Sequence, residues 1–143
     1  MADLDLIRSV AEEVRYWAEG RAAGTVNESD LTGWCAIASA QLWRKLRDVG
    51  VLGELHVWLS CTGDTAHVFV VVDDVVVDVT ATQFSRMRAD PVYIEHLRVA
   101  QHWDWYHAAE IFETPEQLIK WQKRSRWIAW QVAWSEEKSK RKK

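Results

Sequence analysis

Residues 66–80 of the chain read AHVFVVVDDVVVDVT, and this stretch decides the fold. Valine and phenylalanine dominate both of its halves, and β-branched and aromatic side chains favour strands over helices. Two acidic residues, Asp73 and Asp74, separate the halves and are typical of a tight hairpin turn. The sequence therefore predicts two antiparallel strands over 66–72 and 75–80.

The hairpin carries one histidine and one carboxylate whose placement follows from the turn. A two-residue turn pairs His67 with Thr80 and Phe69 with Asp78. His67 and Asp78 then share a face, diagonally offset by roughly 7–8 Å between backbones, which is within side-chain reach. A carboxylate within a run of valines on a covered sheet is costly unless it has a partner. We expect His67 to be that partner, although a backbone or arginine partner would serve a purely structural role.

A third strand is predicted upstream, over residues 54–61, and completes an antiparallel meander. A four-residue turn over 62–65 places Cys61 on the face opposite His67, within the core, and places on the His67 face the side chains of His56, Trp58 and Ser60. Both faces of the meander are apolar enough to need cover from helices. The predicted fold class is therefore α+β, with an antiparallel β-meander packed against helices.

The first amphipathic helix is expected over residues 4–19, ending at Gly20. Arg15 lies among its charged residues and is expected to face water. The apolar stripe of this helix consists of Ile7, Ala11, Val14 and Ala18.

The second helix is expected from a Thr32 cap to Val49, just before Gly50. Its apolar stripe consists of Cys35, Ala38, Leu42, Leu46 and Val49. Cys35 therefore lies in the first turn and points at whatever this helix packs against. The start of a helix carries partial positive charge and free N–H groups, which favour a thiolate and can hold an oxyanion.

Beyond Gln83 the pattern weakens, with short strands expected over 91–94 and 106–112. Thr114 is the predicted cap of a last helix that reaches about Glu137. Apolar residues fall on two nearly opposite stripes of this helix, one through Trp121 and a second formed by Trp127, Trp130 and Trp134. A helix that is apolar on two sides is buried twice, so a homodimer through it is one expectation.

Length and composition exclude several classes of protein. The 143 residues, 48% of them hydrophobic, support one core, so we expect a single domain over 1–137 and a solvated, disordered basic tail over 138–143. The net charge of −3 gives no support for nucleic-acid binding. No apolar run approaches the roughly 18 residues of a membrane span and no signal peptide opens the chain, so we expect a cytoplasmic protein with free thiols.

Cys35, His67 and Asp78 form the constellation with the clearest chemistry, in that order and 32 and 11 residues apart. A cysteine that transfers acyl groups needs an imidazole to take its proton and later to protonate the leaving amine. It also needs a carboxylate that orients the imidazole and stabilises its charged form. The predicted helix stripe and the predicted hairpin register bring these three groups together independently.

Three segments resemble a known group: Gly-Trp-Cys-Ala at 33–36, Ala-His-Val-Phe-Val at 66–70 and Val-Asp-Val-Thr-Ala-Thr-Gln-Phe at 77–84. Together they are similar to the papain/transglutaminase-like cysteine enzymes, including bacterial and phage-borne members. The resemblance implies a Cys35 nucleophile, His67 as acid and base and Asp78 as orienting group, with no cofactor. If water takes up the acyl group, the enzyme would be a protease or a glutamine deamidase. If an amine takes it up, the enzyme would be a transglutaminase. The implied substrate is a protein, a peptide or a small amide.

The chain departs from this pattern at one position. Papain-type proteases place a glutamine that supports the oxyanion six residues before the cysteine, where this chain has Ser29. The backbone N–H of Cys35 is one expected oxyanion donor, and Trp34 or Gln83 is the candidate for the second.

Simpler interpretations stand beside the catalytic one. Cys35 taken alone is more typical of a packed core thiol, and His67 of a strand histidine with a satisfied hydrogen bond. Cys61, His56 and His67 match no zinc-ligand spacing, so no metal is expected. The alternative to an enzyme is a binding or adaptor module that keeps the fold without catalysis, which the two-sided tryptophan helix and the basic tail suit.

Overall fold

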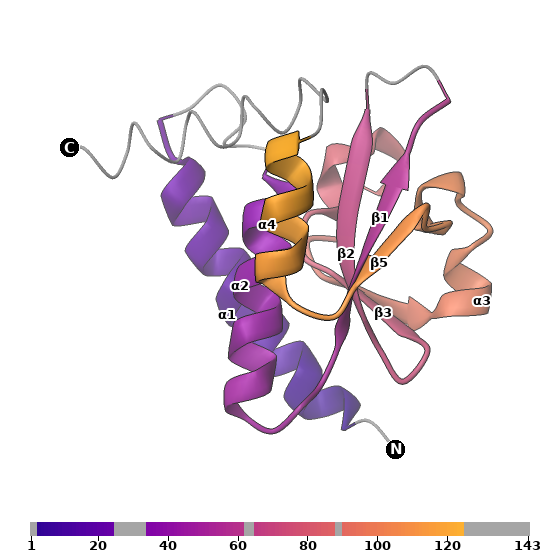
Figure 1. Ribbon diagram of the computed structural model, residues 1–143. Coiled ribbons are helices and arrows are strands. Elements are labelled where there is room, and N and C mark those ends of the chain that lie inside the picture. The colour runs from indigo at the N-terminus through magenta and orange to yellow at the C-terminus, as the bar shows by residue number, and fades with distance from the viewer. Residues whose placement is uncertain (1–2, 25–33, 62–64, 88–89, 125–143) are drawn as a thin grey trace.

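The computed structural model describes residues 3–24, 34–61, 65–87 and 90–124. Within these ranges five strands form one sheet in the order β4-β3-β2-β1-β5, and each neighbouring pair is antiparallel (Figure 1). The predicted α+β class is confirmed. In chain order the elements are α1 (Leu4–Ala22), α2 (Cys35–Asp48), β1 (Glu54–Leu59), β2 (Ala66–Val72), β3 (Val75–Asp78), the 3-10 turns η1 (Ala81–Gln83) and η2 (Ser85–Met87), β4 (Tyr93–His96), α3 (Leu97–Ala100), the 3-10 turn η3 (Asp104–Tyr106), β5 (Glu110–Phe112) and α4 (Pro115–Arg124).

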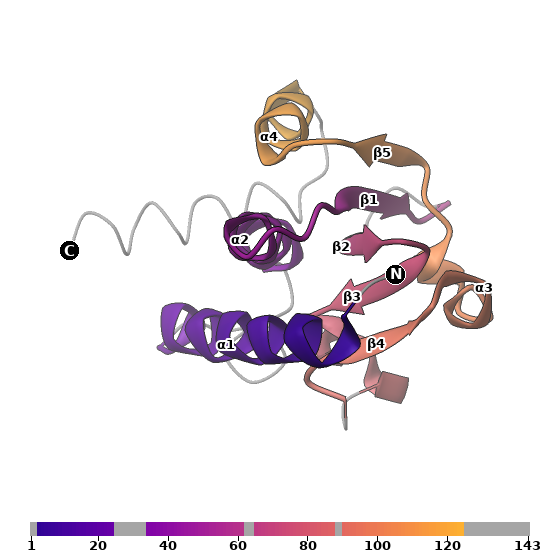
Figure 2. The same ribbon diagram turned by 90° about the horizontal axis from the view of Figure 1, so that it is seen from below.

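Helices cover the sheet from both sides, as the apolar faces of the meander predicted. Helices α1, α2 and α4 lie on one side and the short α3 lies on the other (Figure 2). On the first side the strand valines pack with the buried stripes of α1 and α2. On the second side Phe69, Val71 and Val76 pack with Met87, Ala100 and Tyr106. The two cores are separated only by the sheet, so neighbouring residues of one strand belong to different cores.

The β2–β3 hairpin has the predicted register. Val70 pairs with Val77 and Val72 pairs with Val75. Asp73 and Asp74 form the two-residue turn with φ angles of 47° and 62°, the left-handed geometry that such hairpin turns require.

The register between β1 and β2 differs from the prediction by two residues. Trp58, and not Ser60, lies opposite His67, because β1 ends at Leu59 and the connection is longer than four residues. A shift of two preserves the alternation of side chains, so Trp58 still shares a face with His67. The prediction that Cys61 belongs to the core is wrong, since Cys61 lies beyond the strand and is exposed.

Helix α1 buries its predicted stripe but departs from the prediction in two ways. It continues through Gly20 to Ala22, because a glycine lowers helix propensity without preventing a helix. Arg15 does not face water and is only 6% exposed. Its guanidinium donates to Val79 O at 3.1 Å and to Thr82 Oγ1 at 2.7 Å, so the segment that follows β3 satisfies the buried charge.

Helix α2 spans Cys35–Asp48 with Trp34 as the residue before it, which is a later start than predicted. The predicted Thr32 cap lies outside the described residues. Val49 was predicted on the buried stripe but is 45% exposed, because the helix has ended and Gly50 turns the chain with a φ of 82°.

The C-terminal elements agree with the sequence only in part. Strand β4 begins two residues later than expected, and β5 covers only the end of the expected 106–112 strand. Helix α4 begins as predicted, with Thr114 Oγ1 accepting from Gln117 N at 3.3 Å. Its continuation, the second tryptophan stripe and the basic tail at 138–143 lie outside the described residues, and the homodimer stays a prediction with them. Within the described ranges no helix is both long and apolar enough for a membrane crossing.

Candidate active site

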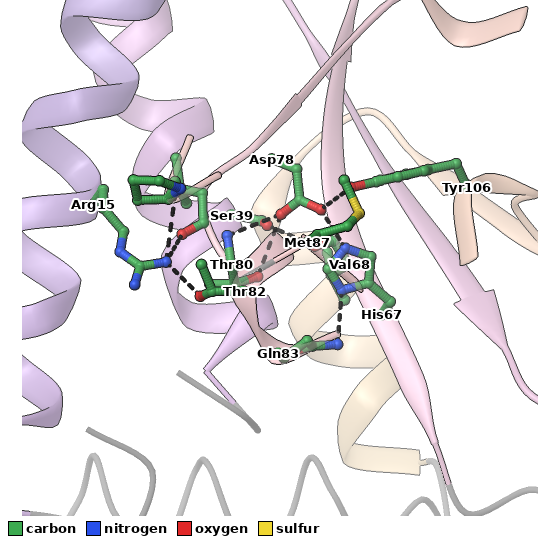
Figure 3. Close-up of polar contacts among 12 residues, drawn as sticks. Arg15, Ser39, His67, Val68, Asp78, Thr80, Thr82, Gln83, Met87 and Tyr106 are labelled. Atoms are coloured by element: carbon green, nitrogen blue, oxygen red, sulfur yellow. Dashed lines mark hydrogen bonds and ion pairs between the residues drawn. The ribbon is translucent and has the colours of Figure 1, made fainter. Parts of the chain in front are cut away.

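His67 and Asp78 meet inside the protein, both fully buried. His67 Nε2 lies 2.6 Å from Asp78 Oδ2 (Figure 3). The hairpin produces this contact, since its register places the two residues on one face and in adjacent strands. The distance is that of a charge-assisted hydrogen bond, which is about twice as strong as a neutral one.

Four donors surround the Asp78 carboxylate, so its burial is compensated. Oδ2 accepts from His67 and also from the Tyr106 hydroxyl at 2.7 Å. Oδ1 accepts from Thr80 N at 2.9 Å and from Thr80 Oγ1 at 3.4 Å. A buried carboxylate without such donors is an unpaired charge and would destabilise the fold by several kcal/mol.

Cys35 is the first residue of α2, and its side chain lies near enough to His67 to help raise the pKa of the imidazole. One turn further along α2, Ser39 Oγ donates to Val68 O at 2.9 Å and so fixes the helix beside β2. The apolar stripe of α2 packs on the opposite face of the sheet from the His67 ring. Toward the start of β2 the neighbouring strand β3 no longer pairs with it, because the β2–β3 ladder begins only at Val70.

The surroundings of His67 favour its charged form. Burial on its own lowers the pKa of the imidazole, but the charge and hydrogen bond of Asp78, and then those of Cys35, raise it to about 9. These surroundings therefore favour the imidazolium form of the ring. A protonated histidine between a carboxylate and a thiol is an arrangement that can hold a proton for later transfer.

Gln83 occupies the second ring nitrogen. Its Nε2 lies 3.0 Å from His67 Nδ1, while its own Oε1 is buried with no hydrogen-bond partner among the described residues. In this orientation the amide donates to a neutral ring. An imidazolium instead needs an acceptor at Nδ1, which Gln83 supplies when its amide is turned over so that Oε1 faces the ring. Since Asp78 engages Nε2, Nδ1 is the nitrogen that remains for proton exchange.

Aromatic rings enclose the remaining surface of His67. Phe84 meets the imidazole edge-on with ring centroids 4.9 Å apart, and Trp105 stacks on Phe84 at 4.1 Å. Trp103 extends this stack at 5.1 Å from Trp105. These apolar rings keep water from the His67–Asp78 pair, which strengthens the electrostatic interactions within it.

The segment between Asp78 and Gln83 is held from behind by α1. Arg15 binds it at Val79 O and Thr82 Oγ1, as seen on the left of Figure 3. Asp78 and Gln83 engage opposite nitrogens of His67 and flank the part of the chain that Arg15 fixes.

Tyr106 and Arg15 belong to the site although nothing in the sequence predicted them there. Tyr106 lies 28 residues from Asp78 in a stretch predicted as a strand, so no spacing connected it to the hairpin. Arg15 lies next to the apolar stripe of α1, where the pattern offered no sign of a buried acceptor. The donor role of Thr80 was also missed, although an aspartate often accepts from the backbone N–H two residues further on.

Comparisons with protein-family models, with curated proteins and with solved structures found no match. The similarity to papain/transglutaminase-like enzymes therefore stays a prediction that rests on the three motifs within residues 33–84. Of the two candidates for the second oxyanion donor, Gln83 contacts His67, whereas the Trp34 side chain is fully buried in the core with α1 and α2. The part of the chain that the structure describes holds no group of three or more histidine, cysteine, aspartate or glutamate side chains arranged for a metal ion.

Proposed function

We propose that the protein is a cysteine-dependent acyl-transfer enzyme in which Cys35 attacks the carbonyl carbon of an amide. One observation carries the proposal: buried His67 is hydrogen-bonded to Asp78, and Cys35 at the start of α2 lies near enough to raise the pKa of the same ring. A papain/transglutaminase-like core and a cytoplasmic location belong to the same proposal.

The reaction follows from the order of these groups. The Cys35 proton resides on His67, and the thiolate sulfur forms a bond to the carbonyl carbon. As the carbon–nitrogen bond breaks, His67 Nδ1 gives its proton to the leaving amine and leaves a thioester on Cys35. Water or a second amine then gives a proton to His67 Nδ1 as it attacks the thioester, the carbon–sulfur bond breaks, and release of the carboxylic acid or new amide restores the thiolate beside a protonated His67. Asp78 keeps the ring oriented through Nε2 throughout.

Helix α2 supplies donors for the oxyanion. Its first backbone hydrogen bond runs from Ala38 N to Trp34 O, so the N–H of Cys35 has no acceptor within the helix. We assign this N–H as the first oxyanion donor and the Gln83 amide as the second. Donors of this type at the developing charge contribute on the order of 3–4 kcal/mol to the lowering of the barrier.

The substrate must displace groups that cover the site. Cys35 is only 2% exposed, and Gln83 is half-buried against Nδ1. An incoming carbonyl displaces the Gln83 amide from the ring before transfer. The substrate class remains a protein, a peptide or a small amide. The acyl group is then transferred from Cys35 either to water or to an amine.

The same burial favours a second function, a binding or adaptor module that uses no catalysis. In that case His67, Asp78 and Tyr106 form a polar network that specifies the packing of the core, and Cys35 is a core thiol.

Acyl transfer to Cys35 is tested with p-nitrophenyl acetate and intact-protein mass measurement. The enzyme releases a burst of p-nitrophenolate and carries one acetyl group, which a Cys35→Ser variant lacks and a Cys61→Ser variant keeps. Acetylation confined to exposed Cys61, with Cys35 unmodified, refutes the proposal and favours the adaptor.

A further inference from the structure

Tyr106 donates to the same carboxylate oxygen that holds His67. Its hydroxyl lies 2.7 Å from Asp78 Oδ2, and His67 Nε2 lies 2.6 Å from that oxygen. Tyr106 is fully buried in η3, outside the hairpin. Burial and the charge of Asp78 raise the pKa of Tyr106 far above its ordinary value, so its hydroxyl stays a neutral donor at any working pH.

Two donors at one oxygen compete for its negative charge. Each hydrogen bond stabilises the carboxylate and thereby weakens the attraction that it exerts on the other donor. Without the tyrosine hydroxyl, more of the charge of Asp78 acts on His67, and the imidazolium holds its proton more tightly. A general acid that holds its proton too tightly transfers it slowly.

We propose that Tyr106 is a positioning residue that, through Asp78, limits the proton affinity of His67. Its catalytic consequence rests on the proposed acyl-transfer function, whereas its effect on His67 does not. The titratable groups that face the pair are Cys35 from α2, Tyr93 from β4 and Tyr106 itself.

Aromatic packing is the competing explanation for Tyr106. Its ring meets Phe69 edge-on at 5.0 Å and stacks on Tyr93 at 5.3 Å. Tyr106→Phe removes the hydroxyl and keeps this packing. Tyr93→Phe is the matched control, because Tyr93 touches the same ring but its hydroxyl is not among the four donors to Asp78.

The test is an NMR titration of His67 in protein labelled at histidine, with His67→Gln identifying the resonance. In Tyr106→Phe the midpoint rises by about half a pH unit or more, and in Tyr93→Phe it stays within about 0.2 units. An unchanged or lower midpoint in Tyr106→Phe overturns the inference.

A second measurement covers the case in which Tyr106→Phe does not fold. Fluorotyrosine placed at position 106 keeps the shape and donates more strongly, so the His67 midpoint falls, and a midpoint that stays fixed also overturns the inference. In the acetylation assay the burst slows in Tyr106→Phe and not in Tyr93→Phe. A wild-type protein without a burst refutes the proposed function alone, since the NMR midpoints do not depend on it.

Discussion

In a Cys35→Ser background, where no thiol can give its proton to the ring, the stability of the protein should fall as the pH rises from 6.5, because His67 holds a proton in the folded state that it has lost in the unfolded chain. Asp78 and Cys35 overcome burial and raise the pKa of His67 from 6.5 to about 9. A group whose pKa is raised by folding stabilises the fold fully below its unfolded pKa. That contribution is lost as the pH passes its folded pKa. At about 1.4 kcal/mol per pKa unit, and without the share of the shift that Cys35 supplies, the loss is on the order of 1–3 kcal/mol.

Urea unfolding at several pH values between 6 and 9.5, followed by tryptophan fluorescence, measures this loss. His67→Gln in the same Cys35→Ser background is the control, because it lacks the titrating ring and leaves no thiol beside it. The Cys35→Ser curve should drop by on the order of 1–3 kcal/mol more than the control curve, with a slope of at most about 1.4 kcal/mol per pH unit. His56, whose pKa is lowered by burial, is present in both proteins, so its contribution cancels in the difference between the two curves. Curves of the Cys35→Ser protein and its control that run parallel from pH 6.5 to 9.5 would refute a charged His67.

Two substitutions separate the chemistry from its support. Asp78→Asn should keep the fold and slow acetylation of Cys35 by on the order of 100-fold or more, because the imidazole loses the group that orients it. If circular dichroism shows instead that this variant is unfolded, Asp78 has a structural role. Arg15→Met should destabilise the protein by about 2–4 kcal/mol in urea unfolding, because it leaves Val79 O and Thr82 Oγ1 without their buried donor. The matched Glu19→Gln change, at the half-exposed partner of Arg15, should cost no more than about 1 kcal/mol, and equal losses for the two would contradict the role given to Arg15.

Local chemistry made the β2–β3 hairpin predictable. Asp73 and Asp74 between two runs of valine specify a two-residue turn, and that turn fixes the register for both strands. The β1–β2 register was missed by two residues, because nothing in the sequence stated that β1 ends at Leu59. The error left the faces unchanged, since a shift of two returns each side chain to its own side.

The candidate site, like the strands, was predictable where its residues are close in the sequence and was missed where they are distant. His67 and Asp78 share a hairpin, so a local rule brings them together, and Gln83 follows close behind in the chain. Tyr106 and Arg15 reach the same network only through the tertiary fold, from a late 3-10 turn and from the first helix. The apolar periodicity of α1 shows only which side of the helix faces the core. Arg15 lies off that apolar stripe, so it was predicted to face water. The periodicity gives no sign of a carbonyl or hydroxyl buried beside the helix.

The central claim is that His67 makes Cys35 a nucleophile, and the rate of alkylation by iodoacetamide as a function of pH tests it most directly. A Cys61→Ser background isolates Cys35, and Cys35→Ser provides exposed Cys61 as the ordinary thiol for comparison. Cys35 should react faster than Cys61 near pH 6–7, and His67→Gln should abolish that advantage. A Cys35 that reacts more slowly than Cys61 at every pH, unchanged by His67→Gln, would contradict the account.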